Sequence, residues 1–476
     1  MVEATRQAAP ESGRRARGPV LVVLGAAAMS FSVLQSLVIP VLPAIGQDLH
    51  VSQAAVTWVL TGYLLSAAVA TPLIGRLGDM FGKRRMLLVT MGALAAGVVI
   101  SGLASSLAML VAGRIVQGAG GALFPLAFGI IRDELPAERV AGAIGFISAT
   151  LGVGGGLGIT LAGPIAAGLG WHWLFWAPLP LIILAALGML GIRESQVRAG
   201  GRIQLSSAVL LSAWLLALLT AITEAPAWGW LSAAFAGTVL ASAGLFAAWW
   251  QWERRSASPL VDVQMLTRPA ILRTNIVAVA VGYTLYGPLV IIPLLLQTPR
   301  VTGYGFGFTL TGAGLLLLPQ TATMFAAGLL AGRLSATIGS ARAVLAGVVL
   351  SGASFALLAT ARTQAWEVVA ATIMIGAAVG LTISAMPNVI VQAVPAGQTG
   401  IATGMNANVR TIGGALGGQV TASIMTSGPK VLGYPRPGAF TVCLVILVAV
   451  SVVAAAIAAS VPGSLISRKA GPCSPP

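Results

Sequence analysis

Two arginines stand inside long apolar stretches of the sequence. Arg114 lies three residues before Gln117, and Arg410 lies four residues after Asn406, so each arginine shares a helical face with an amide. An arginine near the centre of a bilayer costs about 2.5–3.5 kcal/mol on insertion scales, and it faces the protein interior or a wet cavity. Each arginine therefore either joins helices by bonding backbone carbonyls or belongs to a polar, weakly positive cavity.

Carboxylates are missing from the centres of these stretches. The chain has twelve acidic residues, and all of them fall in the tails, between stretches or near their ends, as Glu224 and Glu367 do. A buried carboxylate is the usual means of holding a cation or carrying a proton inside a membrane. The sequence also has no metal-ligand cluster, nucleotide-binding loop or acid/base pair. We therefore expect no enzyme activity, no metal site and no bound cofactor.

Aromatic and amide side chains are the other candidates for ligand contact. A pocket lined by aromatic rings and a few amides is apolar and adaptable. For any one of these residues, packing or lipid contact is about as plausible as ligand contact. Together with the two arginines and their amide partners, the candidates are Gln35, Tyr63, Tyr283, Tyr286, Gln320 and Asn388.

The composition indicates that these residues are set in membrane-spanning helices. Of the 476 residues, 57% are apolar and 8% are charged, against about 25% charged in soluble domains. So little polar material cannot cover the surface of a soluble protein of this length, and lipid must be the solvent. The net charge of +15 comes from short basic clusters between apolar stretches, which is typical of membrane topology rather than of nucleic-acid binding.

The apolar stretches predict an all-α integral membrane protein with fourteen transmembrane helices. A bilayer core about 30 Å thick needs roughly 20 mostly apolar residues per helix. The stretches are continuous and lack the alternation of barrel strands. They cover residues 19–43, 55–75, 86–106, 108–130, 140–167, 173–192, 205–223, 230–252, 274–297, 308–332, 343–361, 365–391, 400–426 and 439–461.

The basic residues orient these helices. If the polar tail 1–18 is cytoplasmic, the cytoplasmic segments hold 21 of the 27 Lys and Arg residues and the outer segments hold four. This asymmetry predicts that both termini, including the tail 463–476, lie in the cytoplasm. No small-residue cleavage site follows the first stretch, so we expect it to be retained as a helix.

The chain also repeats itself. The segment 75–85 reads GRLGDMFGKRR, and the segment 332–342, GRLSATIGSAR, is a degraded copy of it. Glycines cluster at 152–158 and again at 413–418. Plain helix packing explains one glycine cluster but not two in register. These pairs predict two six-helix bundles, 19–200 and 263–462, with an inserted two-helix hairpin and linker at 201–262, as in transporters that alternate access about a central site.

Several of these segments resemble the major facilitator superfamily, in particular its fourteen-helix drug:proton antiporter branch. Segment 75–85 resembles the superfamily's loop between helices two and three. Segment 110–121 resembles its fourth-helix motif, and 152–164 resembles the antiporter motif of helix five. Further likenesses are the aromatic segment 171–176 before helix six and the segment 408–410 of helix thirteen. The resemblance covers residues from about 30 to 430.

Three positions depart from the branch's pattern. Met80 stands where the loop signature has an arginine, and Ile159 replaces the proline of a Gly-Pro pair in helix five. Leu34 occupies the position of an aspartate in helix one. The acid that the resemblance implies for coupling is therefore absent.

The resemblance implies a gating role for residues of the loop and of helix five. Asp79 would receive the positive N-terminal end of a helix from the other half, and Lys83, Arg84 and Arg85 would pair with Asp133, Glu134 or Glu138. Glycines of helix five would line the contact between the halves. Anchoring of the topology is the alternative role for the basic residues. The residues assigned to gating are Gly75, Asp79, Gly82, Arg84, Gly154 and Gly158.

Together these observations predict a secondary active transporter of the inner (cell) membrane. We expect a monomer that exports small amphiphilic compounds, such as an antibiotic or a secreted metabolite, by alternating access. The proton gradient would drive it, and multidrug efflux and antibiotic resistance are the expected roles. Uptake or facilitated exchange of a neutral molecule is the alternative, and a non-transporting receptor is disfavoured because the termini are short.

The absence of a carboxylate inside the membrane affects two predictions, namely which substrates bind and how transport is coupled to the proton gradient. Arg114 and Arg410 would repel a cation that has no counter-charge in the cavity, so we expect neutral or anionic substrates. Coupling would use Glu224, Glu367, an arginine-linked water chain or, as we prefer, the substrate's own proton or charge.

Overall fold

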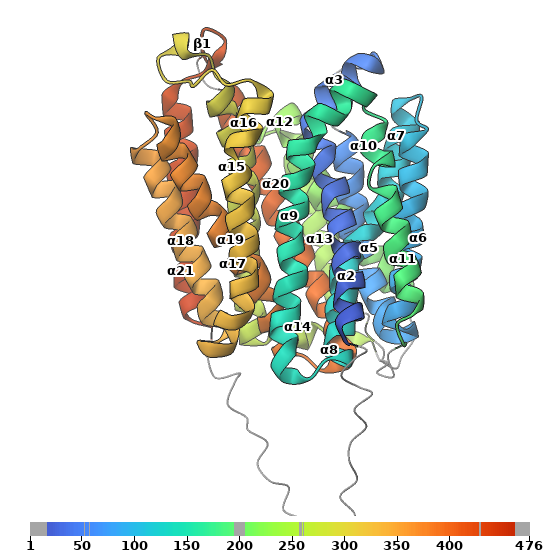
Figure 1. Ribbon diagram of the computed structural model, residues 1–476. Helices are drawn as coiled ribbons and strands as arrows, with labels where there is room; N and C mark the ends of the chain where they lie inside the picture. Colours follow the sequence, from blue (N-terminus) through green and yellow to red (C-terminus); the bar gives the residue numbers. More distant parts are fainter. Residues whose placement is uncertain are drawn as a thin grey trace, which may run out of the picture.

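The computed structural model describes residues 17–51, 53–56, 58–194, 205–256, 259, 261–427 and 430–461. Long helices run side by side along one axis (Figure 1). We call the end of the bundle at which α2 begins and α21 ends the tail end, and the opposite end the far end. The continuous long helices are α2 Arg17–Leu37, α5 Trp58–Phe81, α6 Lys83–Gly102, α9 Ala137–Leu169, α12 Leu205–Trp228, α13 Ala233–Arg255, α15 Pro269–Gln297, α17 Leu318–Thr337, α18 Ser340–Thr360, α19 Ala365–Ala393, α20 Thr399–Ser427 and α21 Pro437–Ala459.

Two further spans are broken helices. The segment Gly118–Ala122, which reads GAGGA, forms the 3-10 helix η2 between α7 Leu107–Gln117 and α8 Leu123–Glu134, because glycine is a poor α-helix former. Pro178 caps α11 Leu179–Leu190 after the short α10 Trp173–Trp176. The remaining short elements are η1 Ile39–Val41, α3 Leu42–Asp48, α4 Gln53–Val56, α14 Val263–Thr267, η3 Arg300–Thr302, α16 Leu310–Leu316, η4 Ala396–Gln398, β1 Lys430–Val431 and β2 Tyr434–Pro435.

The predicted helical membrane fold is confirmed. Among the described residues, 13 helices are long and apolar enough to cross a membrane. Helix α20, with 29 residues, is long enough to be a fourteenth but carries Asn406, Asn408, Arg410 and several glycines. Each predicted stretch corresponds to one of these helices or broken helices. Helix α14 and the β1–β2 hairpin were not predicted, since short connecting elements leave no hydropathy signal.

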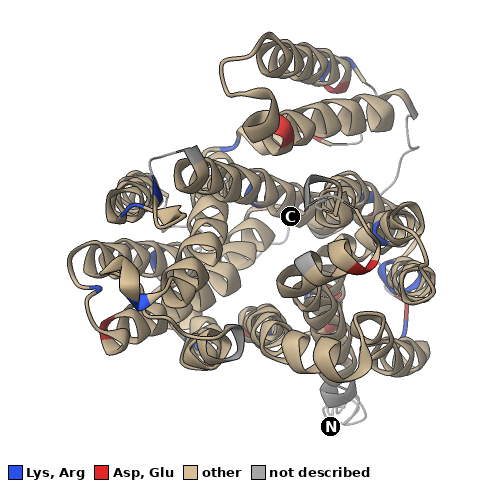
Figure 2. Ribbon diagram, turned by 90° about the horizontal axis from the view of Figure 1, so that it is seen from above, with Lys and Arg blue, Asp and Glu red and all other residues tan. Residues whose placement is uncertain are grey.

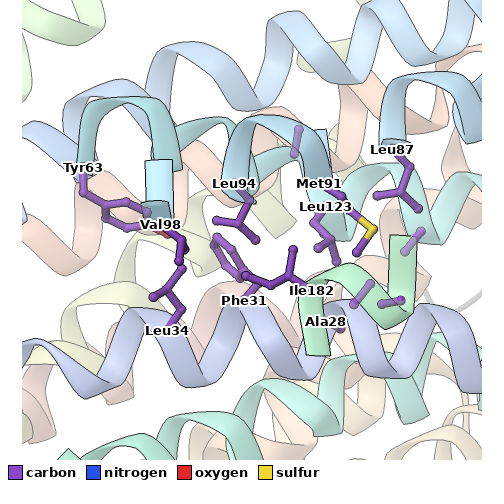
Figure 3. Close-up of a cluster of buried hydrophobic side chains, with 14 of the residues drawn as sticks. Ala28, Phe31, Leu34, Tyr63, Leu87, Met91, Leu94, Val98, Leu123 and Ile182 are labelled. Carbon is purple, nitrogen blue, oxygen red and sulfur yellow. The ribbon is translucent and has the colours of Figure 1, made fainter. Parts of the chain in front are cut away.

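Two groups of helices form the bulk of the molecule. We call α2 to α11 the first helix group and α15 to α21 the second helix group. The largest cluster of buried apolar side chains lies in the first group and includes Phe31, Met91, Leu94 and Ile182 (Figure 3). Leu34, at the position where the resembled branch has an aspartate, is 1% exposed within this cluster. Two smaller clusters lie in the second group.

Helices α12 and α13 pack against each other, and α12 reaches the rest of the bundle at α5 and α20. Seen from above, part of the molecule lies outside the larger groups, and charged residues are sparse (Figure 2). Within the pair, Ser207 donates a hydrogen bond to the buried Glu253, and Trp214 packs near Trp249.

The two repeated loops have the same backbone form. Gly82 and Gly339 occupy equivalent positions, and each has a positive φ, +114° and +94° respectively. Each is the N-cap of the following helix, α6 or α18. A positive φ is a conformation that glycine adopts far more readily than other residues, so the glycine retained in both copies has a common physical cause.

The glycine clusters also pack in equivalent ways, but not where we expected. A side chain added at Gly154 or Gly158 would meet Ser32 or Ser36 of α2, so these two glycines lie within the first group and not between the groups. Gly413 and Gly417 likewise lie against α15 of the second group. The contact between the groups is made instead by Gly152 and Gly156, whose neighbours are on α17.

Candidate functional site

A central cavity of about 250 Å³ lies between the two helix groups. Its walls come mainly from α2, α5, α9, α15, α17 and α20, and they are mostly apolar, as is usual for small-molecule sites. Ile39 and Leu289 line it near the far end and are 40% and 39% exposed. The cavity therefore opens toward the far end.

Five of the residues predicted to contact a ligand line this cavity. Tyr63 of α5 is buried in the wall, with 4% of its surface exposed. The side chain of Tyr286 lies close to the side chains of Gln35 and Arg410. The five residues are Gln35, Tyr63, Tyr286, Gln320 and Arg410.

Arg114 and Gln117 lie behind the wall and not in it. The Arg114 Nε atom donates to the Val59 carbonyl oxygen at 3.2 Å, and its Nη1 donates to Gln117 Oε1 at 2.8 Å. Gln117 in turn donates to the Gly97 carbonyl at 2.9 Å and to the Ser101 hydroxyl at 2.8 Å. Arg114 thus joins helices, and it reaches the cavity only through Tyr63, whose ring centroid lies 4.5 Å from its guanidinium carbon.

Three other predicted contacts also lie outside the cavity wall. Tyr283 faces Cys443 of α21, because an α-helix turns it about 60° away from Tyr286. Asn388 donates to the Ser384 carbonyl at 3.1 Å and, more weakly, to Ala141 of α9 at 3.4 Å. Asn406 donates to Asn275 at 2.9 Å, and it lines a smaller adjoining cavity instead of the central one. These residues hold helices together.

The cavity also has lining residues that the sequence did not single out as ligand contacts. They are mainly small, such as Ser32, Gly155 and Thr321. Small side chains line cavities because they leave space, but in helices this rich in Ala and Gly they give no distinctive pattern.

Among the described residues that line the central cavity and the smaller cavity beside it, Arg410 is the only charged one. It lies where the central cavity meets a second, smaller cavity of about 20 Å³ on the tail-end side. Phe124, Leu151, Ile383 and Ala407 also belong to both walls. The small cavity is therefore an extension of the floor of the large one.

Asp79 closes the tail end of the interface between the groups. Its two carboxylate oxygens accept hydrogen bonds from the backbone N–H groups of Gly400, at 3.2 Å, and Ile401, at 3.1 Å. These are the first residues after Thr399, where α20 begins, so the fully buried acid receives the positive end of a helix from the second group. This is the contact expected for it from the sequence.

Further contacts close the same end. Arg132 of α8 donates to the Thr399 hydroxyl and to the Val394 carbonyl, both at 2.7 Å. Gly75 lies so close to α20 that an added Cβ would stand 2.8 Å from the Gly400 oxygen. In the repeat, Gly332 lies equally close to Gly142 of α9. The tail end is thus closed at two seams, α5 with α20 and α9 with α17.

The basic residues of the first loop stay within the first group. Lys83 Nζ lies 2.5 Å from Asp133 Oδ2 and 3.9 Å from Asp79 Oδ1, as the predicted pairing with Asp133 requires. Arg84 differs from the prediction, since its side chain donates to the carbonyls of Met189 and Leu190 at 3.0 and 2.8 Å. It binds the C-terminal end of α11, where unpaired carbonyls attract a cation.

Comparison with known proteins places this geometry in a family. A family model described as Major Facilitator Superfamily matches residues 24–418. The tetracenomycin C resistance and export protein of Streptomyces glaucescens is 31% identical over 434 residues, covering 88% of this chain and 78% of that protein. The lincomycin resistance protein of Streptomyces lincolnensis is 30% identical, covering 88% of this chain and 87% of that protein.

A solved structure has the same fold. The human organic anion transporter MFSD10 (TETRAN) superposes with a TM-score of 0.69 at 17% identity, covering 94% of this chain and all of that one. At this identity the likeness concerns the fold alone.

Proposed function

The chain belongs to the major facilitator superfamily, and from that premise we propose that it exports small amphiphilic compounds across the cell membrane by alternating access, driven by the proton gradient. The observation that carries the proposal is the central cavity, which opens at the far end and is closed at the tail end by Asp79 and its neighbours. The relatives named for resistance and export support the direction of transport.

The closed tail end supports alternating access because its contacts are separable. Asp79 and Arg132 each bind α20 or the segment before it through a few hydrogen bonds, which a rigid-body rotation of the two groups breaks together. With the basic tail-end segments in the cytoplasm, the present conformation exposes the cavity to the outside. The rotation that breaks these contacts would open the tail end and load the cavity from the cytoplasm, and its reverse would return the cavity to the outside.

The residues that line the cavity also affect how transport can be coupled to the proton gradient. In the described part of the chain no carboxylate lines it. The Glu367 carboxylate accepts hydrogen bonds from the backbone of Thr363 and Gln364 at the start of α19, away from the cavity. Glu224 is not in the wall either. This arrangement supports coupling through a proton or charge that the substrate itself carries.

Accumulation of a panel of labelled compounds tests the proposal, in cells with and without the gene and with and without a proton-gradient uncoupler. We expect lower accumulation of at least one compound in cells with the gene, and the uncoupler should remove the difference. Higher accumulation in those cells would indicate uptake instead. An unchanged difference after uncoupling would contradict the proton drive.

Two tyrosines of α15 provide a matched control for the same assay. Tyr286→Ala should raise accumulation severalfold, because Tyr286 lines the cavity. Tyr283→Ala, three residues away and facing α21, should leave transport per folded molecule near the wild-type level. Equal effects of the two substitutions would argue against the cavity as the transport site.

A further inference from the structure

Ser148 of α9 has an unsatisfied hydroxyl group at the floor of the cavity. Its side chain is 3% exposed and its Oγ atom has no hydrogen-bond partner within the described chain. Hydroxyls in helices ordinarily bond a carbonyl one turn back, as Thr150 does with the Ile147 carbonyl at 2.6 Å. Ser148 lines the small cavity beneath Arg410, so its free hydroxyl borders the space that the guanidinium also borders.

The Arg410 guanidinium likewise has donors that are not used within the described chain. No hydrogen bond or ion pair of its side chain is found among the residues that the structure describes, and the titratable side chain that it interacts with is the neutral Tyr286. A guanidinium carries five N–H donors and stays charged at any physiological pH. A cation at membrane depth without a counter-charge is unfavourable, and here both walls lack a carboxylate that could supply one.

The donors of this floor are thus complementary to an anion. Arg410 offers paired N–H groups in the fork geometry that matches a carboxylate, and Ser148 offers one O–H. The walls around them are mostly apolar and aromatic, including Phe124 and Phe128. Thr403 and Asn406 also line the small cavity, but their donors are already used within the protein, by the Thr399 carbonyl and by Asn275. The small cavity, about 20 Å³, has room for about one water-sized group, which is the size of a carboxylate or phenolate oxygen but not of a ring.

We propose that Arg410 and Ser148 form an anion subsite at the floor of the cavity, which binds the carboxylate or phenolate of an exported amphiphile while the apolar body of the compound fills the cavity above. This rests on the proposed transport function. The subsite narrows the substrate class from neutral or anionic compounds to weak organic acids. It also couples export to the energised membrane, because a substrate that leaves as its anion carries negative charge outward, in the direction that an inside-negative membrane potential favours.

Binding of three matched probes to the full-length protein tests the subsite. The protein is placed in phosphatidylcholine nanodiscs near neutral pH, with empty nanodiscs as the background. The fluorescent probes are 9-anthracenecarboxylate, its neutral carboxamide and the cationic 9-(aminomethyl)anthracene. We expect the carboxylate to bind about tenfold or more tightly than the amide, since hydrogen bonds to a charged group are among the stronger ones. The cation should bind most weakly.

Variants of Arg410 and Ser148 then test whether these two residues cause the preference for the carboxylate over the amide. Arg410→Gln should abolish it while amide binding persists, which shows that the cavity is intact, and Arg410→Lys should retain part of it. Ser148→Ala should weaken carboxylate binding severalfold. Thr150→Ala is the matched control, since that hydroxyl is satisfied within its own helix, and it should change nothing. An undiminished carboxylate preference in Arg410→Gln would overturn the proposal.

Chloride distinguishes a substrate site from a site for an inorganic anion. The carboxylate preference should persist when chloride is replaced by gluconate. If chloride raises the melting temperature through Arg410 but no carboxylate preference exists, the floor binds inorganic anions and the proposal fails. Because binding is read without transport, a protein that shows the preference but moves no probe in proteoliposomes would count against the transport function and not against the subsite.

Discussion

At the scale of single residues, Asp79 joins the two helix groups with one carboxylate. We predict that Asp79→Asn slows transport severalfold or more while substrate affinity stays within a few fold, because Asp79 bonds the start of α20 and is absent from the cavity wall. Transport rates in proteoliposomes and binding to the purified protein would separate the two effects.

Asp262 is the control for this substitution. Its Oδ1 also accepts two backbone hydrogen bonds, from Gln264 at 2.9 Å and Met265 at 3.2 Å, but both come from the helix that it caps. Asp262→Asn should leave the transport rate near that of the wild type. A large loss of affinity in Asp79→Asn, with normal cycling, would contradict its place in the tail-end contact.

The sequence identified Asp79 correctly but misjudged several polar residues of the membrane helices. Helix α15 is largely apolar on every side, because lipid and protein interior accept the same side chains, and in α20 small polar residues and glycines are spread along the whole helix. Without an amphipathic pattern, nothing in the sequence separates Tyr286 in the wall from Tyr283 outside it, or Arg410 in the wall from Arg114 behind it. The distinction depends on how each helix is rotated, which only packing determines.

At the scale of elements, the seam between α9 and α17 depends on glycine. A Cβ added at Gly156 would overlap Thr321 of α17, a β-branched side chain with little rotamer freedom. We predict that Gly156→Ala destabilises the protein by about 1–3 kcal/mol, as overpacking usually does. Thermal unfolding in detergent would measure the loss.

Gly163 lies two turns further along the same helix and has no neighbour within 4 Å of an added Cβ. Gly163→Ala should therefore be neutral, or stabilising by up to about 1 kcal/mol, because alanine has the higher helix propensity. If the two alanine variants unfold at the same temperature, the close contact at Gly156 does not contribute to stability.

The number and placement of the helices could be predicted because about 20 apolar residues span a bilayer core as a helix, and a membrane permits few other backbone structures. The helix that each glycine faces could not be predicted from the sequence. The sequence pointed to Gly154 and Gly158 for the contact between the groups, but they face α2, whereas Gly152 and Gly156 face α17. Glycines crowd this segment of α9 so densely that spacing alone does not assign them to a face.

At the scale of the whole molecule, the orientation in the membrane is open to direct test. We predict that Thr337, exposed at the tail end, faces the cytoplasm and that Thr363, exposed at the far end, faces outward. Single cysteines at these positions, in a background with Cys443→Ala and Cys473→Ala, would be probed with a membrane-impermeant maleimide. Intact cells should label position 363 only, and broken cells both. Labelling of position 337 in intact cells would reverse the orientation.

Helix α12 covers α5 and α20, so lipid has less access to the junction of the two groups on this flank of the molecule than on the other. Leu211, Trp214 and Leu215 of α12 pack with Ile401 and Met405 of α20, so acyl chains meet α12 before they meet this seam. The seam of α9 with α17 has no such cover in the described structure. An amphiphile that diffuses laterally within a leaflet therefore meets α12 on one flank and the junction of the two groups directly on the other, so the α12–α13 pair gives the molecule a preferred side of approach from the bilayer.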